Sequence, residues 1–108
     1  MATEYTFLPD LTREADIPEN GILSRTLFQD EHTKVILFGF AAGQELTAHT
    51  APMKASILVL DGSCSLTLGS DTKEGVPGTW VMMEPKLEHG IRAITPTKML
   101  LTMHKQAR

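Results

Sequence analysis

Two of the four histidines in this chain stand at fixed distances behind glycines, and histidine is the side chain best suited to chemistry near neutral pH. His49 follows Gly43 by six residues, and His89 follows Gly78 by eleven. A neutral imidazole binds transition metals, donates or accepts a hydrogen bond, or acts as a general acid or base. The pair therefore indicates either a metal site or two polar anchors for a small molecule.

A metal site at this pair needs a further donor, because zinc and iron generally take at least three protein ligands. Glu45 lies four residues before His49, about 13 Å away in an extended chain that rises ~3.3 Å per residue. Glu88 directly precedes His89 and points to the opposite face of a strand. His104 is the candidate third ligand, and the sequence leaves its orientation open. The predicted metal residues are therefore His49 and His89, with His104 as a third.

The single cysteine has a simpler interpretation. Cys64 alternates with Leu66 and Leu68, which predicts a small buried side chain on a half-buried strand. A nucleophilic thiol would need a neighbouring base or positive charge, and the sequence names none. One cysteine permits no intramolecular disulfide, which agrees with a reducing compartment.

Short strands separated by turns must position these side chains. Runs rich in β-branched and aromatic residues, such as 35–40, favour strands, and Gly and Pro mark the turns between them. No amphipathic helix is predicted, although the loop between Pro9 and Gly21 has room for one helical turn. The pattern is typical of an all-β sandwich or barrel, here an eight-stranded jelly roll. The predicted strands cover residues 3–8, 22–29, 35–40, 56–60, 64–68, 79–83, 91–95 and 99–104.

The composition narrows the class of protein. A length of 108 residues, 42% of them hydrophobic and 21% charged, fits one globular domain. The net charge of −3, with mixed signs and no Lys/Arg cluster, argues against nucleic acid as a partner. No apolar run approaches the ~20 residues that span a bilayer, and the first residues lack the pattern of a secretion signal. We therefore expect a cytoplasmic protein with neither nucleic-acid nor membrane partners.

The stretch around the first histidine resembles the first sequence motif of the cupins, a family of small double-sheet barrels. In that motif a glycine is followed, after five residues, by His-x-His, then by a glutamate and a closing glycine. Gly43, His49 and Gly62 match its spacing. Ala51 and Ala55 stand where the second histidine and the glutamate would be. The resemblance therefore implies the fold, but with a reduced set of metal ligands.

The stretch around the second histidine resembles the second cupin motif, in which a glycine, five residues, Pro-x-Gly and two further residues precede the histidine. Gly78 and His89 match this pattern, whereas Pro85 comes one residue late and Lys86 stands at the inner glycine position. Only 15 residues separate the closing glycine of the first motif from Gly78, a spacing typical of compact microbial cupins. The chain is thus similar to the RmlC-like, conserved-barrel cupins across residues 35–104.

The resemblance implies a double-stranded β-helix, or cupin jelly-roll barrel, with a pocket inside it. If the chain is extended after His49, residues 49, 51, 53 and 55 share the face that looks into the barrel. Alanines at two of these positions would enlarge the cavity. The predicted ligand pocket is lined by Met53, Ile57, Val59 and Met83, with the two histidines as its polar anchors.

The resemblance also implies a homodimer. Residues 1–33 are expected to form N-terminal strands and an arm at the dimer interface, and residues 34–108 the barrel core of the same domain. Trp80 has the parity of an outward-facing residue on its strand. With Leu58 and Leu60 it is predicted to lie in that interface.

These observations favour two functions. The first is a small-molecule binding or sensing module with a degenerate metal site, because two motif ligands are replaced by alanine. The alternative is a divalent-metal enzyme of dioxygenase or isomerase type, in which His49 and His89 hold zinc, iron, nickel or manganese incompletely. A structural dimer without a ligand is the third, plainest interpretation.

Overall fold

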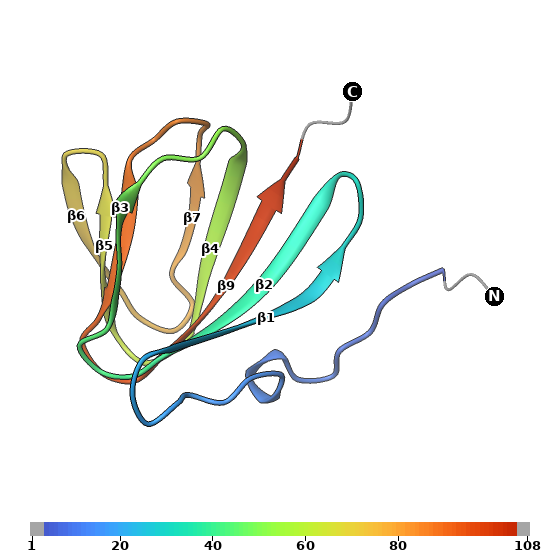
Figure 1. Ribbon diagram of the computed structural model, residues 1–108, viewed down its shortest axis with the longest axis horizontal. Coiled ribbons are helices and arrows are strands. Elements are labelled where there is room, and N and C mark those ends of the chain that lie inside the picture. The colour runs from blue at the N-terminus through green and yellow to red at the C-terminus, as the bar shows by residue number, and fades with distance from the viewer. Residues whose placement is uncertain (1–3, 106–108) are drawn as a thin grey trace.

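Two antiparallel β-sheets packed face to face make up this protein (Figure 1). The computed structural model describes residues 4–105. A 3-10 helix, η1 (Leu11–Arg13), precedes nine strands in those residues. The strands are β1 (Ile22–Gln29), β2 (Thr33–Phe40), β3 (Glu45–His49), β4 (Lys54–Asp61), β5 (Cys64–Leu68), β6 (Asp71–Gly75), β7 (Trp80–Met83), β8 (His89–Ala93) and β9 (Thr97–His104).

The strand order confirms the predicted all-β jelly roll. One sheet has five strands in the order β1-β2-β9-β4-β7, and the other has four in the order β3-β8-β5-β6. From β2 to β5 and from β6 to β9 the chain crosses between the sheets at every connection, so strands distant in sequence become neighbours. This exchange places β3 beside β8, the strands that carry the two motif histidines.

The core lies between the two sheets and is built by alternation along each strand. On β4, Ala55, Ile57 and Val59 face inward and are no more than 5% exposed. Leu66 from β5 and Ile91 from β8 meet them from the other sheet, also within 4% exposure. Burying each large apolar side chain contributes about 1.5–3 kcal/mol, so this layer holds the two sheets together.

The structure corrects two predictions about individual elements and confirms a third. Residues 4–8 form no strand, so the expected strand over 3–8 is wrong for its described part, and residue 3 lies outside the described residues. Two strands were missed, β3 and β6, which makes nine rather than eight between residues 4 and 105. The predicted helical turn is confirmed as η1, where Asp10 accepts a hydrogen bond from the Thr12 backbone N–H.

The segment before β1 covers the part of the five-stranded sheet's outer face that β1 and β2 form. Arg25 on β1 donates from Nη1 to the carbonyl of Glu14 at 2.8 Å. A Cβ on Gly39 of β2 would lie 2.5 Å from the carbonyl oxygen of Asp16, so the segment sits directly on the sheet backbone. Leu37 on the same outer face is 0% exposed as a result. The division into an arm (1–33) and a barrel core (34–108) stays a prediction.

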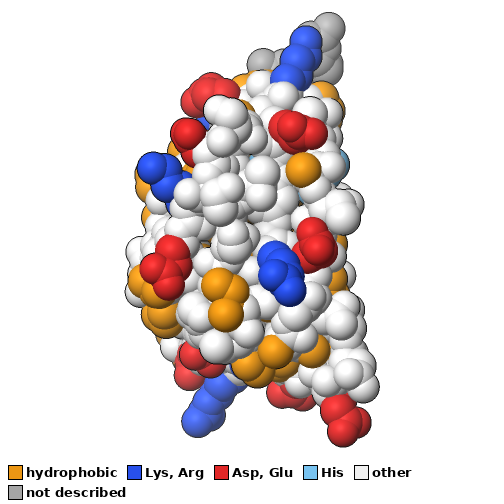
Figure 2. Space-filling model, turned by 90° about the vertical axis from the view of Figure 1, so that its left-hand side faces the viewer, with side chains coloured by type: hydrophobic (Ala, Val, Ile, Leu, Met, Phe, Trp, Pro, Cys, Tyr) orange, Lys and Arg blue, Asp and Glu red, His pale blue; other side chains and the backbone are white. Residues whose placement is uncertain are grey.

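The outer side of the four-stranded sheet is polar and mixed in charge. Figure 2 shows acidic and basic side chains interspersed on this side, with small groups of apolar residues between them. Within residues 4–105, no helix has the length and apolar character that crossing a membrane requires.

Candidate functional site

The two motif histidines meet at one end of the four-stranded sheet. His49 is the last residue of β3 and His89 the first of β8, and their Cα atoms are direct partners in the antiparallel ladder. Their ring centroids lie 4.5 Å apart with the planes tilted by 54°. Residues 40 positions apart in the sequence thus form one imidazole pair.

Each imidazole is held by the carbonyl oxygen two residues before it. Nδ1 of His49 lies 2.9 Å from the Thr47 oxygen, and Nδ1 of His89 lies 2.8 Å from the Leu87 oxygen. A carbonyl oxygen only accepts, so Nδ1 carries the proton in both rings. In the neutral form, Nε2 of each ring is therefore a bare acceptor, free to bind a metal or a hydrogen-bond donor.

A small cavity of about 100 Å³ adjoins the pair. A water molecule occupies ~30 Å³ in the liquid, so the cavity has room for about three waters or one compact group. His49 is exposed and His89 half-buried, so the histidine end is the polar, accessible one. The cavity is lined by Phe38, Leu46, His49, Ile57, His89, Gly90, Ile91, Met99 and Leu101.

Of the four apolar residues predicted to line the pocket, Ile57 alone borders the cavity beside the histidines. Val59 and Met83 lie in the closed core at 0% and 2% exposure. Met53 lies in the loop between β3 and β4, which belong to different sheets. The alternation assumed from residue 49 to residue 55 breaks in that loop, so the parity argument does not extend across it.

The residues that the prediction missed come from both sheets. Leu46 and Ile91 flank the histidines on their own sheet, and Phe38, Met99 and Leu101 face them from the other. The parity of Ile91 with His89 on one strand was a usable signal. Which residues of the five-stranded sheet lie opposite the histidines depends on how the two sheets pack, and no local sequence pattern indicates that packing.

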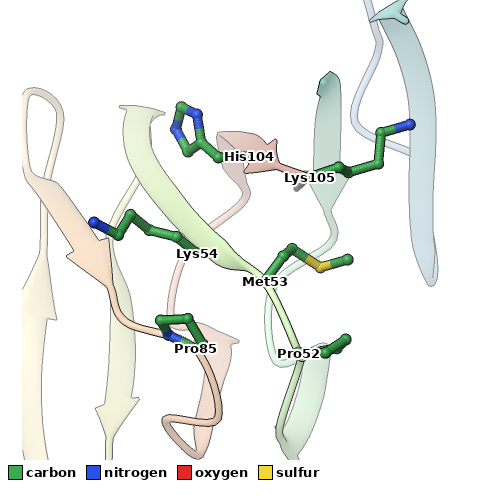
Figure 3. Close-up of a pocket in the computed structure, with 6 residues that line it drawn as sticks. All are labelled: Pro52, Met53, Lys54, Pro85, His104 and Lys105. Carbon is green, nitrogen blue, oxygen red and sulfur yellow. The ribbon is translucent and has the colours of Figure 1, made fainter. Parts of the chain in front are cut away.

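His104 does not join the histidine pair. It pairs with Lys54 in the five-stranded sheet and has opposite parity to Leu101, which lines the cavity. It borders a separate, larger hollow of about 500 Å³ with Pro52, Met53, Lys54, Pro85 and Lys105. Figure 3 shows Lys54 and His104 directed to one side and Met53 and Lys105 to the other, so these side chains do not converge on one point.

The described residues do not supply a complete metal site. Between residues 4 and 105, no group of three or more His, Cys, Asp or Glu side chains is placed to hold one ion. Ala55, at the glutamate position of the motif, is 5% exposed and opposes Met83 and Met103. Two imidazole nitrogens fall short of the three protein ligands that catalytic zinc and iron sites use, so the donor set does not fit such a site.

A strained turn borders the same end of the barrel. Lys86 has φ of 72°, in the left-handed region that favours glycine. Its backbone N–H donates to the Ala51 carbonyl at 2.8 Å and so ties the loop before β8 to the loop after β3. The lysine occupies the position that the motif resemblance assigns to glycine.

The cysteine lies in the core, as predicted. Cys64 is 0% exposed, and burial raises the pKa of its thiol. A buried thiol with a raised pKa is a poor nucleophile. Cys64 therefore contributes packing rather than chemistry.

No sequence-family model matches the chain, and a search of curated proteins found no match. Solved structures do match over almost its whole length. A conserved protein of unknown function from Streptococcus pyogenes superposes with a TM-score of 0.86 at 29% identity, covering 98% of this chain and 93% of that one. A cupin superfamily protein from Desulfitobacterium hafniense gives 0.80 at 24% identity, covering 98% and 95%. The chain folds as a small cupin domain.

A third similar structure, an RmlC-like cupin from Desulfovibrio desulfuricans, has a TM-score of 0.81 at 24% identity and covers 93% of this chain and 97% of that one. The cupin fold explains why the two histidine-bearing strands are neighbours. Compared with the four-ligand cupin motif, this domain keeps His49 and His89 and has methyl groups at residues 51 and 55.

Proposed function

We propose that this cupin domain binds a small molecule whose donor group is held by His49 and His89. The observation that carries the proposal is the pair of Nδ1–H to carbonyl hydrogen bonds, which leaves two unprotonated Nε2 atoms beside an apolar cavity. Mostly apolar walls with a few fixed polar groups are the usual make-up of a ligand site. The pair supplies the polar end and Ile57, Met99 and Leu101 supply apolar wall.

The chemistry of the lining restricts the ligand. Two neutral Nε2 atoms accept hydrogen bonds, and no Lys or Arg among residues 4–105 lines the cavity to neutralise an anion. A hydroxyl or amino group on a compact apolar body matches this lining. A cavity of about 100 Å³ admits one such group rather than a large cofactor.

A metal-dependent enzyme of dioxygenase or isomerase type is the second candidate function. It is favoured by the same Nδ1 hydrogen bonds, since metal-ligating histidines are commonly oriented by a carbonyl or carboxylate on their other nitrogen. His49 and His89 would supply two nitrogen ligands to zinc, iron, nickel or manganese. We rank it second because the described residues offer no third ligand beside the pair.

We also propose a homodimer through the outer face of β4, β7 and β9. Leu58 pairs with both Trp80 and Leu100, so three apolar side chains form one row on that face. Trp80 is 59% exposed and Met82 37% exposed in the single chain. A cytoplasmic location and the absence of nucleic-acid and membrane partners stay predictions.

The binding proposal is tested with phenol and toluene, two probes of similar shape of which only phenol donates a hydrogen bond. Chemical-shift titration of uniformly ¹⁵N-labelled protein, followed at backbone amides beside the cavity, should show tighter binding of phenol than of toluene. One hydrogen bond is worth about 0.5–1.5 kcal/mol, or about 2- to 12-fold in affinity. The double variant His49→Ala, His89→Ala should lose this preference, whereas His32→Ala, which removes an exposed turn histidine, should keep it.

The same preparations separate the two functions by elemental analysis. Near-stoichiometric metal in the wild type and none in the double variant would promote the enzyme. A wild type that prefers phenol over toluene and stays metal-free, also after exposure to zinc, iron, nickel and manganese salts, would support the binding module. A protein that binds neither metal nor either probe would contradict both proposals.

A further inference from the structure

The strand that carries His49 has one residue more than its partner just before the histidine. Leu46 pairs with Ile91 and His49 pairs with His89. Between these two pairs, β3 has Thr47 and Ala48, while β8 has a single glycine. Two residues opposite one define a β-bulge.

The bulge decides which way His49 points. Leu46 packs against the core, so it faces inward. Successive side chains of a regular strand alternate between the faces, so a residue three positions further on would face outward. The extra residue restores the inward direction and brings His49 level with His89, whose ring centroid lies 4.5 Å away. With Thr47 and Ala48 both present, a regular pairing without the bulge would turn His49 outward and the imidazole pair would not form.

The single residue opposite the bulge must be glycine for lack of space. A Cβ on Gly90 would lie 2.9 Å from the Leu46 oxygen, 3.0 Å from the Ala48 nitrogen and 3.2 Å from the Ala48 Cα. All three atoms belong to the backbone of β3, so no side-chain rotation can relieve the contact. Gly90 is not among the glycines with positive φ, so its role is spatial rather than conformational.

We propose that Gly90 is a positioning residue for the ligand pocket: it admits the bulged backbone of β3 and thereby turns His49 toward His89. The inference rests on the proposed function, because Gly90 matters to ligand binding only if the paired Nε2 atoms of His49 and His89 hold the ligand. Gly90 borders the cavity with its backbone, so a side chain there would act through His49.

The first test is Gly90→Ala, measured by ¹⁵N and nuclear Overhauser spectra of the histidine rings. We expect the cross-peaks between the rings of His49 and His89 to disappear. The Nδ1-protonated signature of His49 should be lost, and the preference for phenol over toluene should fall to about onefold. Gly43→Ala is the matched control, because a Cβ there has nothing within 4 Å and its cost is left-handed strain alone.

A second variant keeps the test decisive if Gly90→Ala folds poorly. Deleting Ala48 removes the bulge and leaves Leu46, one intervening residue and His49, so that regular alternation again directs the histidine inward. In this background Gly90→Ala should be tolerated and the ring cross-peaks should persist. Such rescue is not expected of a glycine that is required only for general stability.

Two outcomes would overturn the inference. If the ring cross-peaks and the Nδ1-protonated signature survive Gly90→Ala, the orientation of His49 does not depend on a glycine at position 90. Equal damage with and without Ala48 would show that the glycine serves something other than the bulge. The ring spectra do not depend on any ligand, so a wild type that ignores phenol would refute the proposed function while leaving the positioning role measurable.

Discussion

Replacing Lys86 by glycine is expected to make the protein more stable. Lys86 is the non-glycine residue with positive φ in the part of the chain that the structure describes, at 72°. It is the third residue of a turn that the Leu87 N–H closes on the Glu84 carbonyl at 3.3 Å, with Pro85 in second place. A proline followed by a positive φ is the pattern of a type II turn, whose third position suits glycine.

The size of the effect follows from two opposing terms. A left-handed conformation costs an ordinary residue about 1–2 kcal/mol, which glycine avoids. Glycine also makes the unfolded chain more flexible, which takes back about 0.4–1 kcal/mol. Taking the middle of each range, the net gain in free energy of unfolding is about 0.5–1 kcal/mol. At ~4–8 °C per kcal/mol for a chain of this size, the melting temperature should rise by roughly 2–8 °C.

Thermal and urea unfolding followed by circular dichroism would measure this gain. Lys86→Ala is the control, since it removes the same charged side chain but keeps a Cβ in the left-handed region. It should stay within about 0.5 kcal/mol of the wild type. Both variants keep the backbone N–H that donates to Ala51. If the glycine variant is no more stable than the alanine variant, the turn stores no such strain and the argument fails.

Two further predictions concern assembly and acid stability. Trp80→Glu should convert the proposed dimer to monomer in sedimentation velocity with little loss of monomer stability. Ile94→Glu, at a similarly exposed apolar residue, should leave the association unchanged. A wild type that is itself monomeric would contradict the proposed dimer. The backbone N–H groups of His32 and Thr33 donate to Asp30 and lower the pKa of its carboxyl group below 3.8. A lowered folded-state pKa contributes stability that is present above the unfolded pKa and is lost as the pH falls through the folded one. Asp30→Ala should therefore weaken the fall of the urea midpoint as the pH drops below about 4. An unchanged dependence of the midpoint on acid pH would argue against these hydrogen bonds.

Local patterns predicted much of the fold. Strand β2 was predicted from its run of β-branched and aromatic residues. Strand β5 was predicted from the alternation of apolar and polar residues around Cys64, which marks one buried face. Strand β6 was missed because its residues are polar and mostly exposed. Its backbone is held extended by pairing with β5, and the composition of β6 gives no sign of that pairing. The segment 4–8 has strand-like residues but no partner strand, so it stays irregular.

The site was predicted only in part, for a related reason. The spacing of His49 and His89 behind their glycines was visible in the sequence, and the structure brings the two side chains together. The cavity walls depend on which sheet each strand joins, so Met53 was placed wrongly by a parity argument that crossed a loop. The role of Gly90 depends on the backbone of a neighbouring strand, which no local pattern describes.

The two imidazoles are oriented by nearby carbonyls, one in β3 and one in the loop that leads into β8, and this separates two properties of the pocket. The acceptors and their orientation belong to the four-stranded sheet, whereas Ile57, Met99 and Leu101 belong to the opposite sheet. Substitutions in the opposite wall can therefore change the size and shape of the cavity without rotating either ring. Under the proposed binding function, ligand selectivity can be altered while the anchoring chemistry stays constant, which makes this pocket a suitable starting point for engineered binding.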